Sequence, residues 1–179
     1  DDYLFLEMHL LRAILKYAND RLHYRSDYDY NMSVHSNVTY HQQDAYGAVA
    51  ASYSYKDLGV SLSSDLRWSD LTADLKHFSY VYRLDNKTSL SVFYRWKGLA
   101  LNATGLYTYC RDHTRRQADP LHRFTWDAMA SYTLGDWTLR TFYKSVFRIP
   151  TLNDLYYTLV GNRSLRPEYT KQVDVGFSY

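Results

Sequence analysis

Residues that could carry out chemistry are widely spaced in this sequence. Seven histidines are present, and no two of them lie four residues apart around a glutamate, as a zinc-protease helix requires. A glycine-rich phosphate loop and a nucleophile elbow are also missing from the sequence. Cys110 is the only cysteine, so we expect neither an intramolecular disulfide nor a thiolate metal cluster. The sequence therefore predicts no enzymatic activity, no catalytic residue, no metal site and no cofactor.

Two groups of side chains could instead contact a ligand. Three cations recur at every fourth residue in one strand-like segment, and they need water or carboxylates around them because they would repel each other in a dry interior: Arg140, Lys144 and Arg148. The segment from 74 to 86 is rich in rings, which offer rigid amphipathic contact area for a bulky ligand, although such rings also suit an aromatic girdle. Its candidate ligand residues are His77, Phe78, Tyr80 and Tyr82.

Strands are the elements that we expect to position these residues. Apolar and polar residues alternate in several segments, most clearly in 124–133 and 170–179, as in strands with one apolar and one polar face. The segment Leu4 to Tyr17 also has helical spacing, and we read it as a strand because strands follow it. About eight strands are predicted, at residues 4–18, 43–55, 58–68, 87–96, 99–110, 123–134, 136–147 and 169–179. The predicted fold class is all-β and antiparallel.

The connections between these strands alternate between short and long. Tight turns are expected around Lys56-Asp57, Lys97-Gly98 and Gly135-Asp136. Long polar loops are expected at about 19–42, 69–86, 111–122 and 148–168. Short turns at one end and long loops at the other are typical of outer-membrane barrels, whereas compact soluble domains rarely carry several such loops. This pattern favours transmembrane β-barrel strands in contact with a lipid bilayer.

Composition agrees with that interpretation and excludes other classes. The chain has 20 Tyr against 7 Phe and 4 Trp, and Tyr suits places where one end of a side chain is apolar and the other wet. No stretch approaches the ~18 consecutive apolar residues that a membrane helix needs. The formal net charge is +2, which does not indicate a nucleic-acid partner.

The sharpest pattern lies near the end of the sequence. A first block from Phe147 to Tyr157 and a second block from Gly161 to Glu168 precede the last alternating strand. Their motif residues are Phe147, Arg148, Pro150, Thr151, Leu152, Asp154, Leu155, Tyr156, Gly161, Asn162, Leu165, Pro167 and Glu168. This pattern resembles the signature of TonB-dependent outer-membrane receptors. Asp154 stands for the usual Glu and Arg166 for the usual Lys, so both keep the charge. Arg163 stands for the usual Pro of the second block, so the φ angle at that position is no longer fixed by a proline ring. The resemblance implies a structural role for these residues, and none is catalytic in the family.

The resemblance also implies a larger protein. Such receptors build a barrel of about 22 strands around an amino-terminal plug, so residues 1–179 would be a partial barrel domain without the plug. The family imports scarce nutrients of the iron-chelate, haem or cobalamin class across the bacterial outer membrane, with energy from a TonB-type partner that acts through the plug. Arg140, Lys144 and Arg148 would then face the lumen and contact plug carboxylates, guide anionic chelates, or simply pair with Asp127 and Asp174. His113 and His122 would be candidate haem ligands.

Two other interpretations remain open at this point. One is a self-contained eight-stranded outer-membrane barrel with an adhesion or structural role, and the other is a soluble β-sandwich that binds a ligand. The sequence opens at Asp1-Asp2-Tyr3 without the features of a signal peptide. We therefore expect either a mature sequence or, preferably, a piece of a longer one.

Overall fold

The computed structural model describes residues 8–28, 34–76, 78–114, 119–157 and 161–179. The chain forms strands joined in chain order, with one short helix before the last of them. Their bounds are β1 (Met8–Tyr28), β2 (Val34–Tyr55), β3 (Leu58–Ala73), β4 (Val81–Trp96), β5 (Leu99–His113), β6 (Leu121–Leu134), β7 (Trp137–Arg148), α1 (Leu152–Tyr156) and β8 (Glu168–Ser178). The predicted number of eight strands and the all-β class are confirmed.

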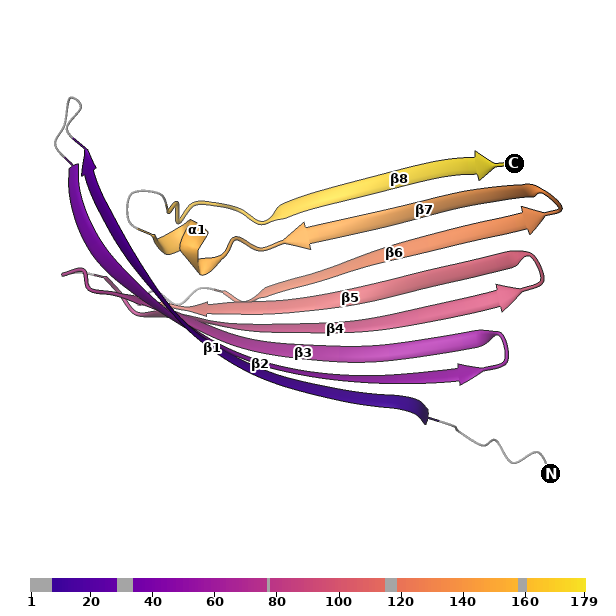
Figure 1. Cartoon of the computed structure of the whole chain (residues 1–179), viewed down its shortest axis with the longest axis horizontal. Helices are drawn as coiled ribbons and strands as arrows, with labels where there is room; N and C mark the ends of the chain where they lie inside the picture. The colour runs from indigo at the N-terminus through magenta and orange to yellow at the C-terminus, as the bar shows by residue number, and fades with distance from the viewer. Residues whose placement is uncertain (1–7, 29–33, 77, 115–118, 158–160) are drawn as a thin grey trace.

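The strands form one antiparallel meander in which every strand pairs with its neighbours in sequence. The sheet curves, and the start of β1 and the end of β8 lie at the same end as the tight turns (Figure 1). Among the described residues β1 and β8 are the two edges of the sheet and do not pair with each other. This open sheet does not fit the self-contained barrel, in which those two strands would pair.

The three tight turns are confirmed, and each places its first residue at positive φ. The φ angles are 50° at Lys56, 49° at Lys97 and 59° at Gly135. Glycine adopts this region without steric cost, whereas lysine pays for the clash of its Cβ. Two-residue hairpin loops favour such angles because they match the twist of the flanking strands.

The predicted long loops are wrong in extent: most residues of 19–42 and 69–86, and both ends of 111–122, belong to strands. The ladder between β1 and β2 continues to the pair Tyr28 and Val34, well inside the predicted 19–42 loop. Strands β3 and β4 likewise extend into the predicted 69–86 loop, and β5 and β6 into the 111–122 loop. Backbone pairing continues there, but the apolar side chains, such as Val38, Tyr40, Leu71 and Val81, now lie on the inner face, so the alternation that served to find the strands changes phase. The 148–168 connection contains α1, which was not predicted.

The segment with ambiguous spacing is a strand. Residues from Met8 onward lie in β1, which pairs with β2 along its whole length, so the strand interpretation of Leu4 to Tyr17 is confirmed for that part. Residues 1–7 lie outside the described residues.

The strand register separates two faces of the sheet. We call the face that carries α1 the inner face, and the opposite face the outer face. Residues directly opposite in the ladders share a face, so the large exposed apolar side chains of successive strands fall together on the outer face. Examples with exposed fractions are Leu62 at 52%, Leu90 at 49%, Leu139 at 53% and Val175 at 70%.

Nothing in the described part of the chain forms a second sheet over this outer face. The β-sandwich interpretation is therefore wrong, since it needs such a layer to cover these Leu, Val and Trp side chains. Rings meet on the outer face near the tight turns, where Trp137 lies 4.5 Å from Tyr179 between ring centroids. Within the described residues, no helix has the length and apolar content to cross a membrane.

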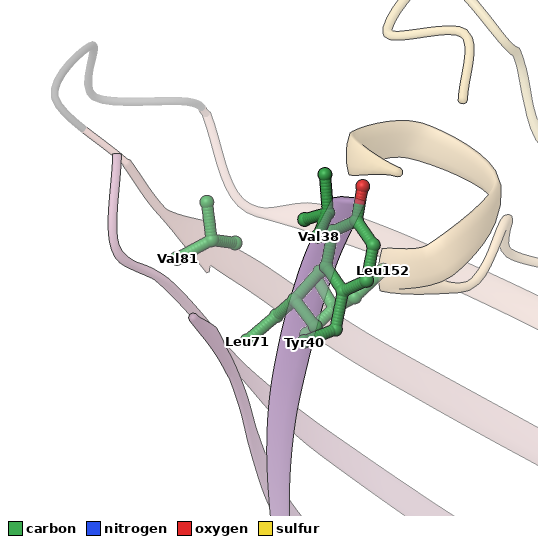
Figure 2. Packing of buried hydrophobic residues seen from close by; sticks show 5 residues of the cluster. All are labelled: Val38, Tyr40, Leu71, Val81 and Leu152. Atoms are coloured by element: carbon green, nitrogen blue, oxygen red, sulfur yellow. The ribbon is translucent and has the colours of Figure 1, made fainter. Parts of the chain in front are cut away.

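A small hydrophobic core lies on the inner face, at the end opposite the tight turns. Leu152 from α1 belongs there to one cluster with Val38 and Tyr40 of β2, Leu71 of β3 and Val81 of β4 (Figure 2). Phe78, Tyr156 and Tyr157 surround this cluster. The core therefore fastens the β7–β8 connection to strands that lie far away in the sequence.

Candidate functional site

The candidate site is built by the β7–β8 connection where it folds over the inner face. Thr151 caps α1: its Oγ1 accepts a hydrogen bond from the Asp154 backbone N–H at 3.1 Å, and the Asp154 carboxylate accepts one from the Thr151 N–H at 2.9 Å. This reciprocal pair is a capping box. Aspartate therefore closes the box at the position where the resemblance expects glutamate. The Thr151 backbone hydrogen bond lowers the pKa of Asp154 below its ordinary value.

This lowered pKa of Asp154 predicts that the stability of α1 depends on pH. The charged carboxylate is the better acceptor, so its contribution is present above the pKa that Asp154 has in the unfolded chain and is lost as pH falls through the lower folded pKa. We expect Asp154→Ala to speed hydrogen exchange of the α1 amides at pH 7. At pH 3 the difference from wild type should shrink, after correction for the intrinsic exchange rate. An equal difference at both pH values would contradict this role of the charge.

The second motif block packs against the end of α1. The Gly161 N–H donates to the Tyr157 carbonyl at 2.7 Å, and the Asn162 N–H donates to the Asp154 carbonyl at 2.8 Å. A Cβ on Gly161 would lie 2.5 Å from the Tyr157 carbonyl oxygen, so any side chain would force the backbone apart. Arg163, which replaces the usual proline, places its guanidinium 5.3 Å from the centre of the Tyr156 ring.

The remaining motif residues lie at the two ends of the connection. The Asn162 side-chain oxygen accepts a hydrogen bond from the Ser164 N–H at 2.9 Å, and the Leu165 N–H donates to the Asn162 carbonyl at 3.2 Å. Pro167 precedes β8, and Glu168 begins that strand opposite Arg148, the last residue of β7. These contacts support a structural role for the motif, which stays a proposal.

Arg83 ties this connection to the wall of the sheet. It lies directly opposite Asp112 in the β4–β5 ladder, and its Nε and Nη2 donate to the two carboxylate oxygens at 2.6 and 2.7 Å. Its Nη1 donates to the Pro150 carbonyl at 2.5 Å. The side chains of Arg83 and Asp112 are only 8% and 16% exposed. Such a two-pronged, buried pair holds geometry far better than a surface pair.

A polar cavity of about 340 Å³ lies between the β7–β8 connection and strands β2 to β5. Its charged lining consists of Arg67, Arg83, Lys87, Arg148 and Asp85. Arg67 is paired with Asp44 at 2.9 Å, and Arg83 with Asp112. Asn153 also lines the cavity, and its buried Oδ1 has no hydrogen-bond partner among the described residues. The cavity lining is therefore polar, and its cations outside these two pairs, Lys87 and Arg148, are exposed.

The predicted lumen cations all lie on the inner face of β7. Lys144 is directly opposite Asp127 of β6, and Arg140 is opposite Gly176 of β8. Arg148 lines the cavity and lies 3.9 Å from Glu168, with both side chains exposed. Within the described part of the chain, no ion pair joins Arg140 or Lys144 to a carboxylate. The structure thus groups the three on one face but places only Arg148 at the cavity.

The predicted ligand segment does not form one site. His77 lies outside the described residues. Phe78 packs edge-on against Tyr40, with 6.3 Å between ring centroids, beside the inner core. The Tyr80 hydroxyl donates to an Asp70 carboxylate oxygen at 3.2 Å. Tyr82 stacks on His113 at 4.3 Å on the outer face.

The two histidines considered as haem ligands both contact tyrosine rings. His113 stacks on Tyr82, and His122 lies 2.6 Å from the Tyr107 hydroxyl through its Nδ1. No group of three or more His, Cys, Asp or Glu residues that could hold a metal ion occurs in the described ranges.

Sequence reasoning missed the residues that fasten the site. Arg83, Asp112 and Leu71 come from three different strands, and only the ladder register brings them to the connection after β7. No local pattern distinguishes them from other residues in alternating strands. The capping box could have been predicted from the sequence, because Thr151 and Asp154 have the required spacing.

Comparisons with known proteins agree with this architecture. The family model described as "TonB dependent receptor-like, beta-barrel" matches residues 10–179. Among solved structures, a chain titled "Copper transporter OprC" superposes with a TM-score of 0.69 at 14% sequence identity. That match covers 94% of this chain and 33% of the other, so the chain spans about a third of the length of that protein. At this identity the likeness concerns the fold alone. A search of curated protein sequences found no match.

Proposed function

Since the chain belongs to the TonB-dependent receptor-like β-barrel family, we propose that it forms part of an outer-membrane transporter. This transporter binds a small nutrient ligand and imports it with energy from a TonB-type partner. The partner acts through a plug domain that the rest of the protein would supply. The eight strands contribute a section of the barrel wall.

The observation that carries this proposal is the contrast between the two faces of one open sheet. The outer face exposes large apolar side chains on every strand, which suits acyl chains and would cost free energy in water. The inner face carries ion pairs, hydroxyl groups and a polar cavity. An edge strand in hydrocarbon leaves backbone groups unpaired at a cost of several kcal/mol each. We therefore propose that further strands of the barrel pair with β1 and β8.

The charges of the cavity support an anionic cargo. Arg67 and Arg83 in its lining are each paired with a carboxylate, so the exposed Lys87 and Arg148 are the lining cations that can meet a cargo. These two exposed cations would attract a metal chelate that carries carboxylate or similar acidic groups. We therefore propose a cargo of the iron-chelate, haem or cobalamin class, with acidic iron chelates fitting the lining best.

Transport is tested with the full-length gene in cells that lack the chromosomal copy. We expect the gene to restore uptake of one labelled cargo from a panel of iron chelates, haem and cobalamin, and deletion of the TonB-type partner to abolish that uptake. Localisation is measured in parallel by separating inner and outer membranes. Failure to restore uptake of any cargo by a protein that reaches the outer membrane would contradict the import function.

The cavity is tested with one substitution and its control. Lys87→Gln should raise the half-saturating concentration of the acidic cargo by about tenfold, which corresponds to the loss of one charge-assisted contact. Lys97→Gln removes a cation from a tight turn at the far end of the sheet and should leave that concentration unchanged. Equal behaviour of the two variants would count against binding in this cavity.

A further inference from the structure

The sheet opens between β6 and β7 at the end that carries α1. The ladder between these two strands stops at the pair Asp127 and Lys144. Strand β6 nevertheless pairs with β5, and β7 with β8, well beyond this point. Within the described part of the chain, residues 121–126 and 145–148 therefore have no ladder partner on the sides that face each other. The two strands diverge there (Figure 1).

One side chain takes the place of the next ladder pair. In register, Ser145 would lie opposite Trp126. The Ser145 Oγ accepts a hydrogen bond from the Trp126 N–H at 2.9 Å and donates one to the Trp126 carbonyl at 2.8 Å. A hydroxyl group can do both, so it satisfies the backbone of Trp126 without a backbone partner. Ser145 is only 7% exposed and marks the point at which β7 leaves β6.

Beyond Ser145, the end of β7 and β8 lies over the inner face of β6. Arg123 shares that face with its partner in β5, Thr108, which lines the cavity. Phe147 and Tyr169 are partners in the β7–β8 ladder and belong to the outward-pointing set of their strands. The Arg123 guanidinium nevertheless lies 5.3 Å from the centre of the Phe147 ring and 5.4 Å from that of Tyr169. An inner-face cation reaches these rings because the β7–β8 end is displaced inward.

Contacts with distant strands hold the β7–β8 end in this inward position. Arg83 of β4 donates to the Pro150 carbonyl, and Leu152 belongs to the inner core with residues of β2, β3 and β4. The cation–π contacts of Arg123 add to them. None of these contacts belongs to the β6–β7 ladder. The inward position is therefore held from outside the two edges that it leaves unpaired.

The two free edges have what a longer ladder needs. Neither 121–126 nor 145–148 contains proline, so every residue keeps its backbone donor, and unpaired backbone groups favour pairing. Three further pairs would follow in register: Trp126–Ser145, Thr125–Val146 and Phe124–Phe147. The next pair would place Arg123 opposite Arg148, and like charges directly opposite each other disfavour pairing. The sequence thus permits a longer ladder and opposes it with one pair of arginines.

We propose that the β6–β7 ladder has two states and that the receptor changes between them. In the inward state, which is the one described above, the ladder ends at Asp127 and Lys144 and the β7–β8 connection covers the cavity. In the extended state, the ladder adds the three pairs in register and carries the connection away from the inner face. Pro150 then loses its bond to Arg83, and Leu152 leaves the core. Each state satisfies groups that the other leaves unpaired, as a two-state element requires.

The cavity links these two states to the cargo. Lys87 lies on β4, whereas Arg148 ends β7, so the two cations line one cavity only in the inward state. A cargo whose acidic groups contact both cations binds the inward state more tightly and shifts the population toward it. This link rests on the proposed function, whereas the two states of the ladder do not.

Disulfide trapping tests the extended state without any ligand. Thr125→Cys and Val146→Cys are combined in the full-length receptor with Cys110→Ser, which removes the native thiol. Ladder partners have Cα atoms about 4.5–5.5 Å apart, within reach of a disulfide. We expect this pair to crosslink under mild oxidant, more slowly than Ala130→Cys with Thr141→Cys, which are partners in the existing ladder. No crosslink at the first pair, with complete crosslinking at the second, would overturn the proposal.

A charge substitution shows whether the crosslink reports the longer ladder. Arg148→Gln removes the repulsion with Arg123 in the extended state and should raise the crosslinking rate by about threefold. Arg95→Gln is the matched control, because the Arg95 guanidinium also lies 5.3 Å from the centre of a ring, that of Phe93, near a tight turn. It should leave the rate unchanged. Equal rates in both variants mean that the crosslink forms without the longer ladder and contradict the two states.

The trapped receptor then tests the link to transport. Crosslinking of the pair at 125 and 146 should lower uptake of the cargo by at least about tenfold, because it depletes the binding state. Reductant should restore uptake, and the control crosslink at 130 and 141 should not change it. If the pair at 125 and 146 prevents folding, Phe124→Cys with Phe147→Cys traps the next pair in register. Full uptake by the crosslinked receptor would contradict the link between ladder and cargo.

Failure of this inference is distinguishable from failure of the proposed function. A receptor that imports its cargo but forms neither crosslink in the unpaired region contradicts the two ladder states alone. A receptor that crosslinks as expected but imports no cargo of the panel contradicts the import function and leaves the two ladder states in place.

Discussion

Replacing Arg83 by methionine should destabilise the folded receptor by about 3–5 kcal/mol, because it leaves a buried carboxylate without its cation. Arg83 meets Asp112 through two hydrogen bonds of 2.6 and 2.7 Å, and both side chains are largely buried. The same guanidinium holds the Pro150 carbonyl, so the β7–β8 connection should loosen as well. Urea unfolding in detergent measures the first effect. Hydrogen exchange of residues 149–157 measures the second.

Two further variants separate the effect of the buried charge pair from that of the hydrogen bond between Arg83 and the Pro150 carbonyl. Arg67→Gln breaks the ion pair with Asp44, in which the arginine is 50% exposed, and should cost no more than about 1 kcal/mol. Arg83→Met combined with Asp112→Leu removes both buried charges and should recover most of the lost stability. Exchange in residues 149–157 should stay fast in this double variant, since the Pro150 carbonyl still lacks its donor. A double variant as unstable as Arg83→Met would contradict the buried-charge explanation.

The number of strands and their two faces could be predicted because the apolar band imposes a strict alternation. Leu62, Leu90 and Val175 each lie in a run where every second residue is apolar, and the register confirms that they share a face. Beyond that band the strands continue with polar pairs such as Asp20 and Gln42, and the apolar side chains there belong to the inner core instead of the outer face. The prediction ended those strands too early for this physical reason.

The predicted ligand segment shows a second limit of sequence patterns. The positions of Phe78 and Tyr82 differ by four, an even number, so the two side chains would share a face if both lay in one strand. Strand β4 begins only at Val81, and Phe78 instead turns to the inner core while Tyr82 lies on the outer face. Alternation between faces holds only within a strand, and no residue in this segment indicates that β4 begins at Val81.

The candidate site was predictable only where its contacts are local. Thr151 and Asp154 lie three residues apart and form their capping box within one turn of chain. Arg83 acts over 29 residues to Asp112 and over 67 to Pro150. Such contacts depend on the complete ladder register of the sheet, which a single sequence does not specify. The cavity charges follow from the same register.

The β7–β8 connection is clamped at several points. Arg83 holds its first residues, the Leu152 side chain fills the inner core, and Gly161 closes its far end against Tyr157. These contacts position the residues of the connection that line the cavity, among them Leu152 and Asn153. This predicts that weakening the core contact alters ligand binding even though Leu152 carries no charge.

Replacing Leu152 by alanine should cost about 2–5 kcal/mol, since it removes a buried side chain and leaves a cavity. Leu152 is 4% exposed and belongs to the buried cluster of Val38, Tyr40, Leu71 and Val81 (Figure 2). The Tyr40–Tyr157 stack, with ring centroids 4.2 Å apart, should also loosen because α1 is no longer anchored. Unfolding in urea and hydrogen exchange of α1 measure these effects, and uptake of the cargo should weaken with them.

The control for this substitution lies in the same connection. Leu165 is 45% exposed, so Leu165→Ala should change stability by no more than about 0.5 kcal/mol. Leu152→Met keeps the volume and should cost less than about 1.5 kcal/mol. If Leu152→Ala behaves like Leu165→Ala in all three measurements, the inner core does not hold α1 in place. The cavity proposed for cargo binding would then lose its physical basis.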